Sequence, residues 1–102
     1  MRVRDQVSPL HPALAGHFPG DPVVPGVVLL RRVCQAVSEA YAVAIAAVPV
    51  VKFHALLRPG EPFDVSLERA AGDRCAFRVT RGETLIASGV VRCAARDDAR
   101  PS

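Results

Sequence analysis

The second half of this 102-residue chain alternates apolar and polar side chains in segments that are separated by turn residues. In residues 63–69 every second side chain is apolar, which is the period of a strand with one buried face. The pattern recurs in residues 74–81 and 84–94, and the short links between these segments contain glycine. It predicts consecutive antiparallel strands joined by tight turns.

An apolar stretch from Val27 to about Val48 precedes these strands. Its polar residues follow helical spacing and form a single stripe: Arg31, Arg32, Gln35, Ser38 and Glu39. We therefore expect a helix over 27–48, ended by Pro49 because proline disfavours helical geometry at the residue before it. Further strands are expected at 1–8 and 50–57.

One apolar helix followed by hairpin-linked strands predicts an α+β fold in which an antiparallel sheet packs on the helix. At this length the chain forms one domain, expected over residues 1–94, with residues 95–102 as a mobile, charged tail. Hydrophobic residues make up 50% of the chain, so another subunit is expected to cover part of the surface.

Composition excludes several classes of site. The three cysteines are widely spaced and form no CxxC pair, so we expect buried thiols, with no zinc or other metal, no disulfide and no cofactor. A net charge of +3 favours an acidic partner. Nucleic acid is not expected, because the chain has one Tyr, no Trp and no arginine stripe interleaved with aromatics.

The N-terminus has charged residues where a signal peptide needs an apolar core. The longest apolar run, 40–51, is shorter than the roughly 20 residues of a membrane span and contains Pro49. The expected location is cytoplasmic.

The segment between the first strand and the helix is stiffened by Pro19, Pro22 and Pro25. Each proline fixes its own φ and restricts the residue before it, so an extended, preorganised segment is predicted. His17 heads this segment, and Gly26 ends it directly before the helix.

A helix start has unpaired N–H groups and a partly positive field, which suit a carbonyl oxygen that gains negative charge. An imidazole titrates near neutrality, so His17 is a candidate base for enolate-type chemistry on a thioester. The residues alone leave a plainer interpretation open, in which the prolines shape a turn and His17 is structural. His11 and His54 receive no role.

The stretch "GHFPGDPVVPGVVLL" (16–30) resembles the signature of the hotdog-fold 3-hydroxyacyl-ACP dehydratases of fatty-acid synthesis and of related aryl-polyene and pigment pathways. The resemblance continues through Gln35 and, more loosely, through "VKFHALLRPGE" (51–61). It implies a hotdog fold, in which an antiparallel sheet wraps a long central helix.

The resemblance also implies that two hotdog units, as a homodimer or a heterodimer, form active sites at their interface. His17 would act as the base, and the backbone N–H groups of Gly26 and Val27 would hold the thioester carbonyl. Phe18 and Arg31 complete the expected substrate-binding set. The family places a carboxylate at the position of Arg31, on the partner's helix, to help the 3-hydroxyl leave as water.

Arg31 departs from that pattern, since a guanidinium stays charged and donates no proton at neutral pH. Glu39 lies about 12 Å further along the helix, too far to substitute. Four possibilities stay open: His17 moves both protons, a second hotdog protein supplies the acid, Arg31 holds a negatively charged substrate group, or Arg31 belongs to a solvated stripe.

Three functions follow from these alternatives. The first is a 3-hydroxyacyl-ACP dehydratase that acts on acyl carrier protein. The second is a catalytically weakened hotdog subunit of a heteromeric dehydratase. The third is an acyl thioesterase that uses Asp21, the acidic residue of the stiff segment.

Overall fold

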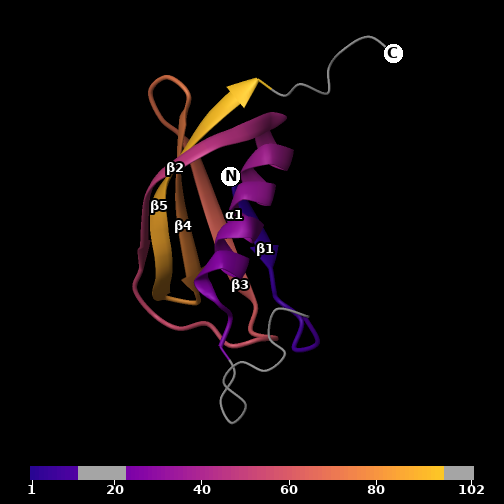
Figure 1. Cartoon of the computed structure of the whole chain (residues 1–102). Helices are drawn as coiled ribbons and strands as arrows, with labels where there is room; N and C mark the ends of the chain where they lie inside the picture. Colours follow the sequence, from indigo (N-terminus) through magenta and orange to yellow (C-terminus); the bar gives the residue numbers. More distant parts are fainter. Residues whose placement is uncertain (12–22, 96–102) are drawn as a thin grey trace, which may run out of the picture.

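The computed structural model describes residues 1–11 and 23–95 of the chain. Five strands and one helix make up the described part, and Figure 1 shows their arrangement. In chain order they are β1 (Arg2–Asp5), α1 (Gly26–Tyr41), β2 (Val43–Phe53), β3 (Phe63–Arg69), β4 (Arg74–Arg81) and β5 (Thr84–Ala95).

The strands form one sheet in the order β1-β3-β4-β5-β2, and every neighbouring pair is antiparallel. Helix α1 lies against one face of this sheet, and the long strand β2 turns back across the C-terminal end of the helix (Figure 1). The structure confirms the predicted α+β class and the packing of an antiparallel sheet on a helix.

The core lies between α1 and the inner face of the sheet. Four helix residues are buried there: Val28, Leu29, Val33 and Val37. They meet the inward side chains of the central strands, which alternate with outward polar ones as the sequence predicts: Phe63, Val65, Leu67, Cys75, Phe77, Val79 and Val91. The opposite side of the helix leaves Val27, Arg31, Gln35 and Glu39 exposed.

The helix is shorter than predicted and ends at Tyr41 rather than near Val48. Ala42 adopts the left-handed conformation with φ of 54°, and its N–H still donates to the Ser38 carbonyl. Residues 43–46 then alternate β-branched side chains with alanine, a period-2 pattern that strand geometry satisfies better than a helix does. A continuous apolar run does not separate these two structures by hydrophobicity alone.

Pro49 lies inside β2 instead of ending the helix. Strand β2 is at the edge of the sheet, and its register with β5 shifts between Ala47 and Val50. An edge position with an irregular register accommodates a residue that has no N–H to donate. The strand predicted at 50–57 is thus the end of a longer strand that stops at Phe53, and the first strand ends at Asp5 rather than residue 8.

The predicted turns are confirmed. Gly72 and Gly82 have φ of +71° and +60°, and each links two consecutive strands of the sheet. Cys75 and Cys93 are buried as free thiols, and Cys34 is half-buried. Among the described residues, none of the His, Cys, Asp and Glu side chains cluster in a way that could hold a metal ion.

The C-terminal strand continues to Ala95, one residue past the predicted end of the domain. The predicted mobile tail otherwise falls on residues 96–102, which lie outside the described part. No helix within residues 1–11 and 23–95 has both the length and the apolar character that crossing a membrane requires.

Candidate functional site

Three of the five predicted site residues lie together at the N-terminal half of α1. Gly26 begins the helix, Val27 follows it, and Arg31 is on the same exposed side one turn later. His17 and Phe18 fall outside the described residues, so their roles remain predictions. The structure therefore shows the half of the candidate site that the helix supplies.

The start of α1 has backbone donors without an acceptor in residues 1–11 and 23–95. Pro25 precedes the helix with φ of −60° and ψ of 144°, and its carbonyl accepts from the N–H groups of Val28 and Leu29. No acceptor among the described residues takes the N–H of Gly26 or Val27, and no side chain caps this end. The first turn also contains no acidic residue, so the partial positive charge of the helix start is not neutralised there.

A hollow of about 520 Å³ with both apolar and charged lining residues lies beside this first part of the helix. Its lining residues are Val27, Val28, Arg31, Arg32, Gln35 and His11. Val27 is 66% exposed, so an apolar side chain stands at its edge next to two guanidinium groups. The hollow can receive a molecule that has both an apolar part and a negatively charged part.

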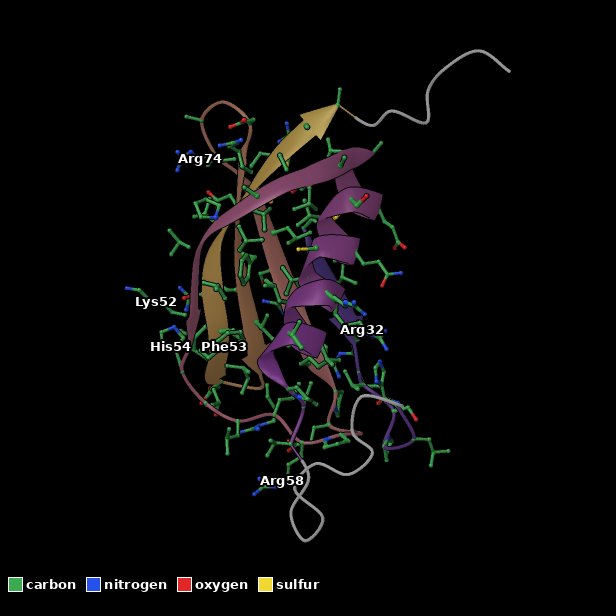
Figure 2. All side chains as sticks on the ribbon, in the orientation of Figure 1. Arg32, Lys52, Phe53, His54, Arg58 and Arg74 are labelled. Carbon is green, nitrogen blue, oxygen red and sulfur yellow. The ribbon has the colours of Figure 1, made fainter. Side chains whose placement is uncertain are left out.

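Arg31 and Arg32 differ in what they contact. Arg32 Nη1 lies 3.3 Å from Asp5 Oδ1, which joins the helix to the end of β1 (Figure 2 labels Arg32). Arg31 is exposed and has no ion pair within the described part of the chain. Arg31 is therefore the guanidinium in this hollow whose charge is not balanced by a carboxylate.

The other members of the predicted polar stripe also have partners. Ser38 Oγ donates to the Val43 carbonyl at 2.6 Å. Gln35 Nε2 donates to Glu39 Oε1 at 3.4 Å. These contacts separate Arg31 from the rest of the stripe, which the sequence treats as one solvated face.

An apolar cavity of about 170 Å³ lies on the other side of Gly26. It is lined by Val24, Gly26, Leu29, Phe53, Ala55, Leu56, Leu57 and Ile86. Phe53, at the end of β2, packs on Gly26 so closely that a Cβ atom there would lie 2.9 Å from the ring. The space that Gly26 provides is thus occupied by an aromatic side chain of the same chain. The Gly26–Val27 peptide consequently lies between the hollow bordered by Arg31 and Arg32 and an apolar cavity.

Two lining residues were missed by the sequence interpretation. His11 reaches the hollow because the chain turns after β1: its N–H donates to the Ser8 carbonyl, and the Leu10 N–H donates to Ser8 Oγ. The Ser8-Pro9 pair is a recognisable turn signal that could have indicated this reversal. Phe53 gives no comparable signal, because its place beside Gly26 depends on where β2 ends.

Comparison with known proteins identifies the family and the fold. The family model described as ApeI dehydratase, ApeI-like, matches residues 1–90. A 3-hydroxyacyl-[acyl-carrier-protein] dehydratase FabZ from Levilactobacillus brevis is 32% identical over 62 residues, which cover 52% of this chain and 42% of the relative. The chain thus spans less than half the length of this curated relative.

Two solved structures share the fold. The dehydratase heterocomplex ApeI:P from Xenorhabdus doucetiae superposes with a TM-score of 0.78 at 21% identity, covering 91% of this chain and 85% of that one. A variant of the fluoroacetyl-CoA-specific thioesterase FlK superposes with a TM-score of 0.67 at 23% identity, covering 92% of this chain and 86% of that one. These likenesses show a hotdog fold, as the sequence predicts. Because the family model matches residues 1–90, most of this chain, the chain belongs to the ApeI-like dehydratase family.

Proposed function

We propose that the chain is a dehydratase-type subunit that acts on 3-hydroxyacyl thioesters carried by acyl carrier protein. The observation that carries this proposal is the position of the Gly26–Val27 peptide between a hollow bordered by Arg31 and Arg32 and an apolar cavity. A thioester carbonyl at the helix start would have its polar end in the hollow and its acyl chain in the cavity. The family membership supports the same substrate class.

The N–H groups of Gly26 and Val27, which have no acceptor among the described residues, are the proposed donors to the thioester carbonyl. Removal of a proton from the carbon beside that carbonyl places negative charge on its oxygen. Two amide hydrogens at the positive end of a helix stabilise this charge, and they need no reorganisation during the reaction. His17 is the proposed base, in agreement with the resemblance of residues 16–30.

The 3-hydroxyl must leave as water, which requires a proton. Arg31 cannot supply it, because its guanidinium does not release a proton at neutral pH. We assign the acid to a second hotdog chain and assign Arg31 to a negatively charged group of the substrate or its carrier. The lack of an ion pair for Arg31 within the described residues supports the second assignment.

A heteromeric assembly fits the fold. Strand β2 is at the edge of the sheet and exposes Val50 and Phe53, so another hotdog chain has an edge and apolar side chains to pair with. The neighbouring structure described as ApeI:P is itself a heterocomplex. Within such a complex this chain either catalyses the dehydration itself or is a subunit of reduced catalytic activity that keeps the acyl cavity.

The test is turnover of 3-hydroxyacyl-ACP, with the 2-enoyl product measured by mass spectrometry. The chain is assayed alone and with a co-expressed hotdog partner, and His17→Ala is compared with His54→Ala. His54 is a suitable control because it is exposed and contacts Ser88 Oγ, away from the helix start. We expect product from the complex, its loss in His17→Ala and full activity in His54→Ala.

The alternatives give different results in the same assay. Product that persists unchanged in His17→Ala means that the chain is a helper subunit whose partner performs the chemistry. Release of free thiol without a 2-enoyl product, abolished by Asp21→Asn, would establish a thioesterase instead. The FlK neighbour makes this measurement necessary, although its likeness concerns the fold alone.

A further inference from the structure

A row of five residues crosses all five strands of the sheet. The strand registers pair Arg2 with Ser66, Ser66 with Arg78, Arg78 with Ser88, and Ser88 with Lys52. Cations on β1, β4 and β2 are therefore joined through serines on β3 and β5. We call these five residues the cationic row.

The cationic row lies on the face of the sheet that is turned away from α1. The neighbouring residues Val65, Val79 and Ala87 are buried in the core, and successive side chains on a strand point to opposite faces. Arg2, Lys52 and Arg78 are exposed, and Figure 2 shows Lys52 pointing away from the helix. This surface is therefore separate from the hollow beside α1.

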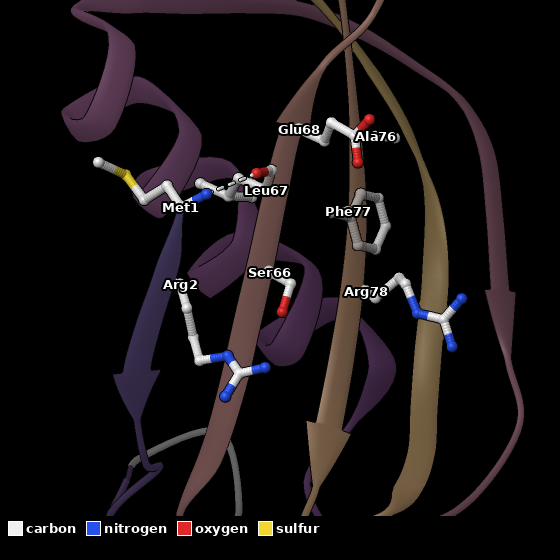
Figure 3. Close-up of a pocket in the computed structure, with 8 residues that line it drawn as sticks. All are labelled: Met1, Arg2, Ser66, Leu67, Glu68, Ala76, Phe77 and Arg78. Atoms are coloured by element: carbon white, nitrogen blue, oxygen red, sulfur yellow. Dashed lines mark hydrogen bonds between the residues drawn. The ribbon is translucent and has the colours of Figure 1, made fainter.

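The row is regularly spaced and lies beside a recess. Cations on every second strand are about 9.6 Å apart at the backbone. Ser66 and Ala76 are small, and they help to line a hollow of about 390 Å³ that Arg2 and Arg78 border (Figure 3). Such a surface has room for side chains of a partner between its charges.

The three cations have no ion pair within the described part of the chain. Two carboxylates lie nearby on β3: Asp64 is 3.2 Å from the guanidinium of Arg4, and Glu68 borders the same hollow. The charge of Arg4 is thus already balanced, whereas Arg2, Arg78 and Lys52 are available to a partner.

We propose that the cationic row is a docking surface for an acidic helix of a partner protein. Carboxylates at every seventh residue of a helix lie on one side of it and are about 10.5 Å apart, close to the spacing of the cations. A helix laid across the strands would therefore place one carboxylate at each of Arg2, Arg78 and Lys52. The net charge of +3, to which these three cations contribute, favours the same kind of partner.

Two other polyanions fit this surface less well. Double-stranded DNA has about one charge per 1.7 Å, far denser than the row, and among the described residues no exposed aromatic lies on this face to stack on bases. On the described part of this face an anionic membrane would meet only a few unpaired cations, the row and the exposed Arg74 of β4, together with the carboxylate of Glu68. The spacing and the limited charge favour a helix.

The test uses a fluorescent helical peptide with Glu at every seventh position and an isomer in which the same residues are spread around the helix. Binding to the full chain is measured by polarisation at low and physiological salt. The row variant Arg2→Gln/Lys52→Gln/Arg78→Gln is compared with Arg69→Gln/Arg74→Gln/Arg92→Gln. The control loses the same charge at the end of the sheet where β3 turns into β4.

We expect the peptide with Glu at every seventh position to bind about tenfold more tightly than its isomer. The row variant should bind that peptide about tenfold more weakly than the unmodified chain does, and the control variant should bind it as the unmodified chain does. Amide chemical-shift changes in the unmodified chain should centre on Ser66 and Ser88, which tests the site without any substitution. Equal losses in both variants, shifts centred on Arg31, or tighter row-dependent binding of duplex DNA or phosphatidylglycerol vesicles would each overturn the proposal. So would the absence of peptide binding.

Discussion

The aromatic ring of Phe53 packs directly on the backbone of Gly26, with only 2.9 Å between its Cζ atom and the place of a Cβ atom. This contact connects the end of the edge strand β2 to the first residue of α1. It also forms part of the wall of the apolar cavity. The ring therefore helps to position the helix start, and with it the donors of Gly26 and Val27, together with the hydrogen bond from the Val24 N–H to the Leu57 carbonyl.

Gly26→Ala should lower the free energy of unfolding by about 1 kcal/mol, because the added methyl group forces the ring to shift. Phe53 is 51% exposed, so the ring has room to move and the loss should stay small. Urea unfolding of Gly26→Ala, Phe53→Ala and the double variant measures the coupling. We expect Gly26→Ala to lower the free energy of unfolding less in the Phe53→Ala background than in the unmodified chain. If the effects of the two substitutions simply add, the contact does not stabilise the protein.

Arg31 and Arg32 should respond differently to the same substitution. Arg32→Gln breaks the contact with Asp5 and should lower stability by about 0.2–1 kcal/mol, the range for exposed ion pairs. Arg31→Gln should leave the unfolding midpoint unchanged and should weaken binding of the acyl-ACP substrate. Thermal unfolding together with KM in the dehydration assay separates the two effects. A stability loss in Arg31→Gln as large as that in Arg32→Gln would show that Arg31 is structural.

Gly89→Ala should be the most disruptive small substitution in the sheet. A Cβ atom at Gly89 would clash with the Val50 carbonyl oxygen and lie 2.9 Å from the ring of Phe77. The backbone and a buried ring cannot move aside as an exposed side chain can. We therefore expect the free energy of unfolding to fall by about 3 kcal/mol, or the chain to fail to fold.

Gly72→Ala provides the control for this loss. Its added methyl group meets nothing within 4 Å, but its φ of +71° is in the left-handed region. A loss of about 1–2 kcal/mol is expected from backbone strain alone. The two variants are compared by soluble yield and by urea unfolding, and similar losses would show that crowding at Gly89 is not important.

Stability should fall at alkaline pH. Burial raises the pKa of the Cys34 and Cys75 thiols, and the nearby Cys93 raises both further. The folded chain then keeps protons that the unfolded chain releases, so stability is intact below the ordinary thiol pKa and is lost as pH rises above it. Urea unfolding between about pH 7 and about pH 10 should show this decline, and Cys75→Ala should reduce it. An equally steep decline in that variant would exclude Cys75 as a cause.

The sequence predicts the central strands and their turns well, because alternation and glycine-containing links are local signals. It misplaces the end of the helix, since the run from Ala40 to Val51 is apolar in either structure. The decision is made by tertiary context: residues 43–53 complete the sheet by pairing with β5, far along the chain. Without that pairing, sequence rules interpret Pro49 as the end of a helix, whereas it lies inside β2.

The candidate site is predictable where it depends on adjacent residues and unpredictable where it depends on the fold. Val27 and Arg31 share one side of α1 and Gly26 is its first residue, which spacing alone reveals. The ion pair that distinguishes Arg32 from Arg31 joins residues 27 positions apart. Phe53 is brought to Gly26 by the path of β2. Such contacts leave no periodic trace in the sequence.

The sheet order has a consequence for how the chain folds as it is synthesised. Strands β1 and β2 come early in the chain, but their neighbours are β3 and β5. Both outer strands and the helix therefore emerge from the ribosome before the surfaces that cover them exist. The β3–β4–β5 meander forms from local pairs, and we expect it to act as the template onto which the earlier half condenses. Until then, an exposed apolar half-chain is available to chaperones or to a partner subunit.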